Sequence, residues 1–141
     1  MQQTLSSPKE TTLLPFTRLV LGVSAVVQLI FGLLGLFLTD LWNSLIWTAP
    51  LPHWPNEIAY FTFINYLATA AAAAFALYQN RWSGARVYFV FSFIYNLLSL
   101  IVVFITAGTI GVPTIMWLLV VLGVIYLPAV AFAWQRQSQA E

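Results

Sequence analysis

Residues 61–76, FTFINYLATAAAAAFA, decide the fold that this sequence predicts. The stretch carries no charge, has one costly polar residue near its middle, Asn65, and continues into a run of alanines at 70–74. Alanines let a second helix approach closely, and an amide in apolar surroundings needs a hydrogen-bonding partner on that helix. The pattern therefore predicts a membrane-spanning helix against which the other helices pack.

The composition of the whole chain indicates an integral membrane protein. Of its 141 residues, 61% are hydrophobic and 6% are charged, and its mean hydropathy is +0.88. A soluble domain carries about 25% charged residues, so a surface this apolar does not face water. The absence of cysteine excludes disulfides, thiol catalysis and Cys-ligated metals. The sequence has no basic patch, so nothing in it favours nucleic-acid binding.

The long apolar runs predict an all-α fold, an integral membrane four-helix bundle. A helix needs about 20 residues to cross a bilayer. The runs that meet this length lie at about residues 16–38, 57–78, 85–107 and 113–134. They form one transmembrane domain, 16–134, between polar cytoplasmic tails at 1–15 and 135–141.

The connection between the first two spans predicts a short interfacial helix. Leu41, Trp42, Leu45 and Ile46 share one helical face there. An amphipathic helix of this kind lies in the plane of the membrane surface, and the prolines that follow it prevent further helix.

The cations predict the orientation of the chain. They fall in the N-terminal segment, in the connection between the second and third spans and in the C-terminal tail: Lys9, Arg18, Arg81, Arg86 and Arg136. The other two connections carry neither lysine nor arginine. Because cytoplasmic loops are enriched in these residues, both termini are predicted to be cytoplasmic. The protein is then a multi-pass protein of the cell inner (plasma) membrane.

Three amides, Gln28, Asn65 and Asn96, form the candidate site. They lie at depths that agree within about one helical turn, and each sits on a stripe of small or polar residues. They either line a binding site for a quinone, a lipid headgroup or another small polar group, or form an interhelical clamp worth about 1 kcal/mol per hydrogen bond. The clamp is the favoured interpretation. The side chains grouped with them are Tyr66, Tyr95, Thr62, Thr69 and Ser92.

The predicted spans hold no Asp, Glu, Lys, Arg or His at mid-depth. This argues against proton-coupled transport and against a haem held between two helical histidines. Asp40, His53 and Glu57 fall on the extracytoplasmic side, but a single histidine without a spacing motif is more typical of a solvated loop than of a metal site. We therefore predict no catalytic residue, no metal site and no cofactor.

Arg18-x-x-x-Gly22 opens the first span, and Gly32 and Gly35 lie near its end. With the span lengths over residues 16–134, these features resemble the DoxX-like group of small four-span bacterial membrane proteins. The resemblance implies a membrane subunit close to quinone-linked redox chemistry, and it carries over no catalytic residue.

These observations lead to three hypotheses about function. The first is a non-enzymatic integral membrane protein, an accessory or structural subunit of a larger complex, in contact with the bilayer and with other membrane subunits or further copies of itself. The second is a stand-alone binding protein or carrier for a small lipophilic molecule, a quinone or a lipid, in the bundle. The third is the DoxX-like subunit of quinone-linked redox metabolism.

Overall fold

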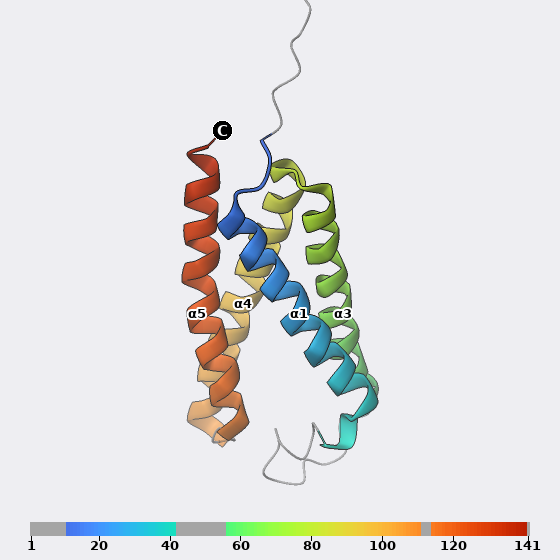
Figure 1. Cartoon of the computed structure of the whole chain (residues 1–141). Helices are drawn as coiled ribbons and strands as arrows, with labels where there is room; N and C mark the ends of the chain where they lie inside the picture. Colours follow the sequence, from blue (N-terminus) through green and yellow to red (C-terminus); the bar gives the residue numbers. More distant parts are fainter. Residues whose placement is uncertain (1–10, 42–55, 111–113, 141) are drawn as a thin grey trace, which may run out of the picture.

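The computed structural model describes the backbone of residues 11–41, 56–110 and 114–140, and the side chains of 11–41, 60, 62–105 and 117–140. Over this part of the chain the structure is helical and contains no strand. The long helices are α1 (Pro15–Phe37), α3 (Asn56–Gln79), α4 (Trp82–Ile110) and α5 (Thr114–Ser138). Figure 1 shows them running alongside one another, with the start of α1, the α3–α4 turn and the end of α5 at one end of the molecule.

Within the described residues, three segments are long and apolar enough to cross a membrane, Pro15–Phe37, Trp82–Ile105 and Trp117–Ser138. This agrees with the prediction of an all-α chain and is compatible with a multi-pass membrane protein. The helix α3 has 24 residues, a similar length, but alanine, threonine and asparagine make it less apolar than the other three. The predicted interfacial helix falls mainly on residues 42–55, which lie outside the described residues.

The helices α1 and α3 pack against each other at two glycines of α1. Gly32 and Gly35 of α1 are buried, and a Cβ atom on Gly32 would lie 2.6 Å from Leu67 Cδ2 of α3. A Cβ atom on Gly35 would overlap the Phe63 ring. Each glycine therefore receives a large side chain of α3, an arrangement that allows close helix packing in membranes.

The buried face of α3 differs from the one expected for Asn65. Phe63, Ala70, Ala73 and Ala76 are buried, whereas Asn65 is exposed. Successive residues of a helix are separated by about 100°, so a residue two positions from Phe63 points to nearly the opposite side. Because Phe63 fits against Gly35, Asn65 is turned away from α1.

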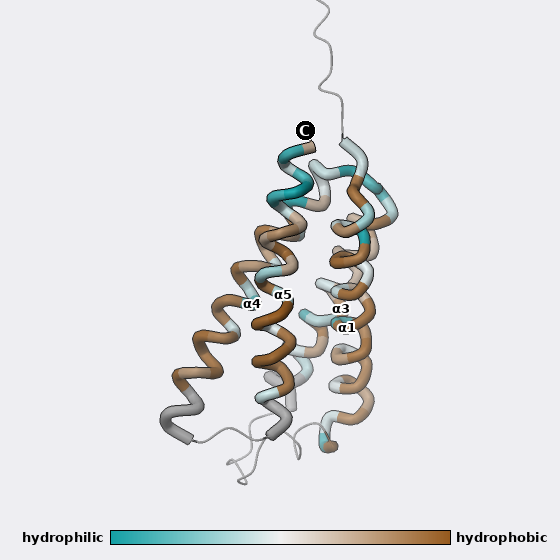
Figure 2. Tube along the Cα trace, turned by 60° about the vertical axis from the view of Figure 1, so that its left-hand side comes forward, coloured by the Kyte–Doolittle hydropathy of each residue, from teal (hydrophilic) through white to brown (hydrophobic). Residues whose placement is uncertain are grey.

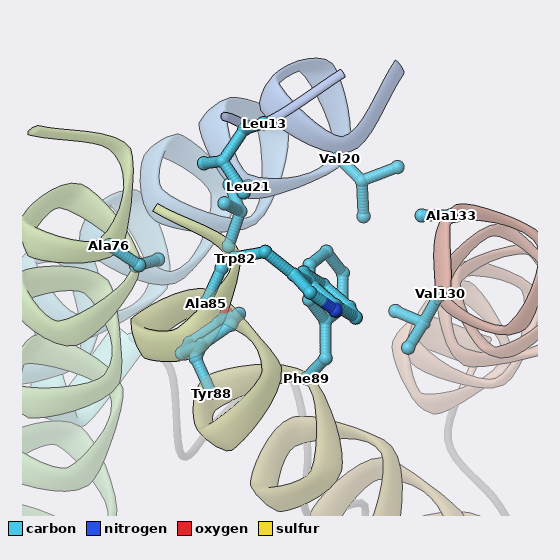
Figure 3. Close-up of a cluster of buried hydrophobic side chains, with 11 residues drawn as sticks. Leu13, Val20, Leu21, Ala76, Trp82, Ala85, Tyr88, Phe89, Val130 and Ala133 are labelled. Atoms are coloured by element: carbon cyan, nitrogen blue, oxygen red, sulfur yellow. The ribbon is translucent and has the colours of Figure 1, made fainter. Parts of the chain in front are cut away.

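A group of buried aromatic and aliphatic side chains fills the end of the molecule near the α3–α4 turn. Trp82, which is 1% exposed, lies 5.8 Å from Phe89 and 5.0 Å from Trp134 between ring centroids. Figure 3 shows the Trp82 and Phe89 rings side by side, with Val130 and Ala133 of α5 beyond them. This packing joins α4 to α5 and, through residues of α1 such as Leu21, to the first helix.

Hydrogen bonds close the same end of the molecule. The fully buried side chain of Gln137 accepts hydrogen bonds from Leu14 N (2.8 Å) and Thr17 Oγ1 (3.0 Å), and its Nε2 donates to Thr12 O (2.9 Å). Gln137 thereby caps α1, whose first N–H groups have no partner within the helix. Arg18 donates to Asn80 Oδ1 from Nε (3.0 Å) and Nη2 (2.7 Å). The start of α1, the end of α5 and the α3–α4 turn are thus joined.

The outer faces of the described helices are apolar. Large hydrophobic side chains are exposed along α1, α4 and α5, among them Phe37, Val87 and Ile125. In Figure 2 the hydrophilic residues gather at the end that holds the C-terminus, and hydrophobic colours dominate the helices away from it. In water such a surface would associate, so its natural surroundings are lipid or other apolar protein surfaces.

The contact between α1 and α3 predicts opposite effects for two alanine substitutions. Gly35→Ala inserts a methyl group into the Phe63 ring, and we expect it to lower the free energy of unfolding by about 1–3 kcal/mol. In the control Gly22→Ala, the new Cβ lies 3.9 Å from Leu77 Cδ1, an ordinary contact. That variant should be neutral or gain up to about 1 kcal/mol from helix propensity. Denaturant titration in mild detergent measures both, and equal effects would contradict the packing.

Candidate functional site

A set of polar side chains connects α1, α4 and α5 inside the structure, and we refer to it as the polar cluster. It consists of Ser24 and Gln28 of α1, Tyr88 and Ser92 of α4, and Tyr126 of α5. Ser24, Tyr88 and Ser92 are buried, and the other two are partly buried. Residues four apart on a helix share a face. Ser24 and Gln28 therefore lie on one face of α1, and Tyr88 and Ser92 lie on one face of α4.

Gln28 and Ser24 join α1 to α4. Gln28 Nε2 donates to Ser24 Oγ at 3.0 Å and to Tyr88 OH at 3.1 Å. The Ser24 and Tyr88 hydroxyls are also hydrogen-bonded to each other. Two residues of α1 therefore make a closed ring of hydrogen bonds with one tyrosine of α4.

Tyr126 extends the polar cluster to α5. Its hydroxyl donates to Ser92 Oγ at 3.0 Å and is bonded to Ser24 Oγ at 3.3 Å. Ser92 Oγ in turn donates to the backbone oxygen of Phe89 at 3.3 Å. Every residue of the cluster takes part in at least one bond that crosses between helices.

One atom of the polar cluster has no hydrogen-bonding partner. Gln28 Oε1 is buried, and among the described residues none donates a hydrogen to it. An amide oxygen in this position has lost its hydration without compensation, which costs about 1–3 kcal/mol.

The structure does not bring the three predicted amides together. Gln28 belongs to the polar cluster, and Asn96 is next to it, with Nδ2 donating to Ser92 O of its own helix at 2.7 Å. Asn65 is exposed and lies on the side of α3 that faces away from α1. The rotation of α3 imposed by Phe63 separates Asn65 from the other two.

The remaining predicted site residues have other surroundings, apart from Ser92. Tyr66 packs against Phe31 of α1 at 6.2 Å between ring centroids and interacts with Tyr95 of α4. Tyr95 stacks on Phe91, one turn earlier in α4, at 6.1 Å. Thr69 Oγ1 donates to Asn65 O and Tyr66 O of its own helix, and Thr62 is exposed. These side chains line the α3 side of the molecule rather than the polar cluster.

Sequence reasoning missed the tyrosines that complete the polar cluster. Tyr88 lies near the predicted cytoplasmic end of its span, where an amphipathic ring is expected for the membrane interface alone. Tyr126 lies in a span that shows no polar stripe. A usable signal was present in α4, because Tyr88, Ser92 and Asn96 recur every fourth residue.

The polar cluster offers hydroxyl and amide groups, which bind and orient but are weak acids and bases. The described residues contain no group of three His, Cys, Asp or Glu side chains able to hold a metal ion. The side chains of His53 and Glu57 lie outside the described residues. The arrangement is therefore suited to joining helices and to hydrogen-bonding a neutral molecule.

Comparisons with protein-family models, with curated proteins and with solved structures find no match to this chain.

Removing one hydroxyl tests how much the polar cluster stabilises the helices. Tyr126→Phe leaves the ring in place but removes the bonds to Ser92 and Ser24. At about 1 kcal/mol per bond within a membrane, we expect the free energy of unfolding to fall by about 1–2 kcal/mol. The control is Tyr78→Phe, since Tyr78 is 87% exposed and should be neutral. A double-mutant cycle with Ser92→Ala should show coupling, and additive effects would contradict the Tyr126–Ser92 bond.

Proposed function

We propose that this chain is a non-enzymatic integral membrane protein, an accessory or structural subunit of a larger membrane complex. One observation carries the proposal. The polar side chains between α1, α4 and α5 are used to bond these helices to one another, while the outer faces of the same helices expose large apolar residues. A protein built in this way offers apolar contact surface to lipid and to other membrane helices.

We also propose that α3 is the fourth span, so that the four helices form a transmembrane bundle. Its 24 residues extend about 36 Å at 1.5 Å per residue, and the apolar core of a bilayer is about 30 Å thick. It packs along α1, whose ends it shares in Figure 1. With a span at α3, the start of α1 and the end of α5 lie on one side of the membrane, as the bonds of Gln137 require.

This proposal places the protein in the inner membrane of the cell, with both termini in the cytoplasm. Three arginines, Arg18, Arg81 and Arg136, belong to segments that meet at one end of the molecule. Arg81 forms an isolated backbone bridge with Thr12, just before α1. Arg136 directly precedes Gln137, which donates a hydrogen bond to Thr12 O. The positive-inside rule assigns such an end to the cytoplasm.

The other two hypotheses concern small molecules. A carrier for a lipophilic molecule is favoured by the unpartnered Gln28 Oε1 in the polar cluster. A subunit of quinone-linked redox metabolism, which the DoxX-like resemblance implies, stays a prediction.

Extraction from the native membrane tests the subunit proposal. After solubilisation in a mild detergent, we expect native electrophoresis to show this 15.8 kDa chain migrating with a much larger assembly of different proteins. The matched control is the same extract in a denaturing detergent, in which the assembly should dissociate. Recovery of only a monomer or a homodimer in mild detergent would contradict the proposal.

Single cysteines test the topology, because the natural chain contains none. We expect a membrane-impermeant maleimide to label Ser44→Cys in intact cells and to label Ser83→Cys and Gln139→Cys only after the cells are opened. Ser83 follows α3 in the chain, so its side of the membrane shows whether α3 crosses. Labelling of both Ser44→Cys and Ser83→Cys in intact cells would contradict the fourth span. Labelling of Ser83→Cys and Gln139→Cys, but not of Ser44→Cys, would contradict the orientation.

A further inference from the structure

The hydrogens of the polar cluster are all in use. Each hydroxyl has one hydrogen to donate, and the Gln28 amide has two. Tyr126 gives its hydrogen to Ser92, and Ser92 gives its own to Phe89 O. Ser24 must then be the donor to Tyr126, and Tyr88 the donor to Ser24, because no other hydrogen is available for these two bonds.

The amide of Gln28 completes this assignment in only one orientation. With Nε2 facing Ser24 and Tyr88, both amide hydrogens find an acceptor. In the opposite orientation Oε1 would face the Ser24 and Tyr88 hydroxyls, whose hydrogens are already donated to other atoms. The two amide hydrogens would then point away from Ser24 Oγ and Tyr88 OH and lose both acceptors. The hydrogen-bond network therefore leaves one unused group, the buried oxygen Gln28 Oε1.

The unused group determines the chemistry of what can join the cluster. A cluster with no hydrogen left to give cannot bind a molecule through a carbonyl or ether oxygen. It can only receive a hydrogen, so a binding partner has to be a hydrogen-bond donor such as a hydroxyl group. The gain on binding is the recovery of a buried, unsatisfied acceptor.

The neighbours of Gln28 on α1 indicate an apolar body for such a molecule. Ala25 and Phe31 lie three residues before and after Gln28, on the same face of α1, and all three side chains are partly exposed. A molecule that approaches Oε1 from outside the protein therefore passes along apolar side chains, which favours a lipophilic molecule over a water-soluble one.

The geometry points to a binding site at Gln28 for a lipophilic molecule that carries a hydroxyl group, which donates its hydrogen to Gln28 Oε1. The site rejects molecules of the same shape that have only acceptor oxygens. A site that depends on one hydrogen bond of this kind discriminates strongly, because the wrong molecule leaves both oxygens unpaired. This inference stands independently of the proposed accessory role, since a subunit and a stand-alone protein can both hold such a molecule.

Matched pairs of probes test the site on the unaltered protein. The first pair is 4-nonylphenol and its methyl ether 4-nonylanisole, and the second is 1-decanol and its methyl ether. Within a pair the alkyl chain is the same, and only the donor hydrogen is replaced by a methyl group. We expect at least one hydroxyl compound to bind about tenfold or more tightly than its ether, which corresponds to about 1.4 kcal/mol. Native mass spectrometry and the shift of the thermal unfolding midpoint in detergent measure this.

The two pairs also identify the type of hydroxyl. A preference in the phenol pair alone indicates an aromatic alcohol, and a preference in the decanol pair alone indicates an aliphatic one. Equal binding of hydroxyl compound and ether in both pairs would overturn the inference, as would a high-resolution structure in which only a water molecule donates to Oε1 in the presence of the probes.

Substitution of Gln28 assigns the preference to this atom. In Gln28→Met, which keeps the length of the side chain without its amide, the preference for the hydroxyl compound should disappear. The matched control is Asn65→Leu, which removes an exposed amide of α3 and should leave the preference unchanged. A preference that persists in Gln28→Met would overturn the assignment. If that variant does not fold, the comparison of probes on the unaltered protein still decides whether the site exists.

Discussion

The contact of Phe63 with Gly35 determines which residues of α3 face the rest of the protein. A glycine in α1 leaves room for one aromatic ring of α3 and for no additional carbon atom between them. Because a helix is rigid, the position of this ring sets the direction of every other α3 side chain. Ala70, Ala73 and Ala76 follow it into the interior, and Asn65 follows the opposite direction. The composition of the polar cluster is a consequence, since Asn65 is kept out of it.

The second constraint is that apolar surroundings supply no hydrogen-bonding partners. Polar side chains between the helices therefore have to satisfy one another. Ser24, Tyr88 and the Gln28 Nε2 group do so at one level, whereas Gln28 Oε1 is left without a partner. Gln137 does so at the end of the molecule where α1 begins and α5 ends. Hydrogen bonds of this kind are worth only about 1 kcal/mol each. Their main effect is specificity, because they are satisfied in one arrangement of the helices.

The elements that were predicted well are those set by local sequence. Helical segments were expected at 16–38, 57–78, 85–107 and 113–134, and the structure has helices Pro15–Phe37, Asn56–Gln79, Trp82–Ile110 and Thr114–Ser138. Of the candidate site, Gln28 and Ser92 are in the polar cluster. Tyr88 and Tyr126 were not expected. The sequence pattern of an apolar helix is equally consistent with a tyrosine at the membrane interface and with a tyrosine that bonds to another helix. Nothing in the tyrosine's own segment shows that a serine of another helix lies beside it.

The sequence by itself determined an all-helical chain apolar enough for a membrane, the approximate helix positions and the segments that carry the cations. These properties depend on hydrophobicity, length and charge within each segment. Only the tertiary structure decided the rotation of α3, the membership of the polar cluster and the role of Gln137 as a cap for α1. These depend on how side chains from distant segments fit, such as Phe63 against Gly35 or Tyr126 against Ser24. A pattern within one helix identifies its polar residues, but their partners follow from packing between helices.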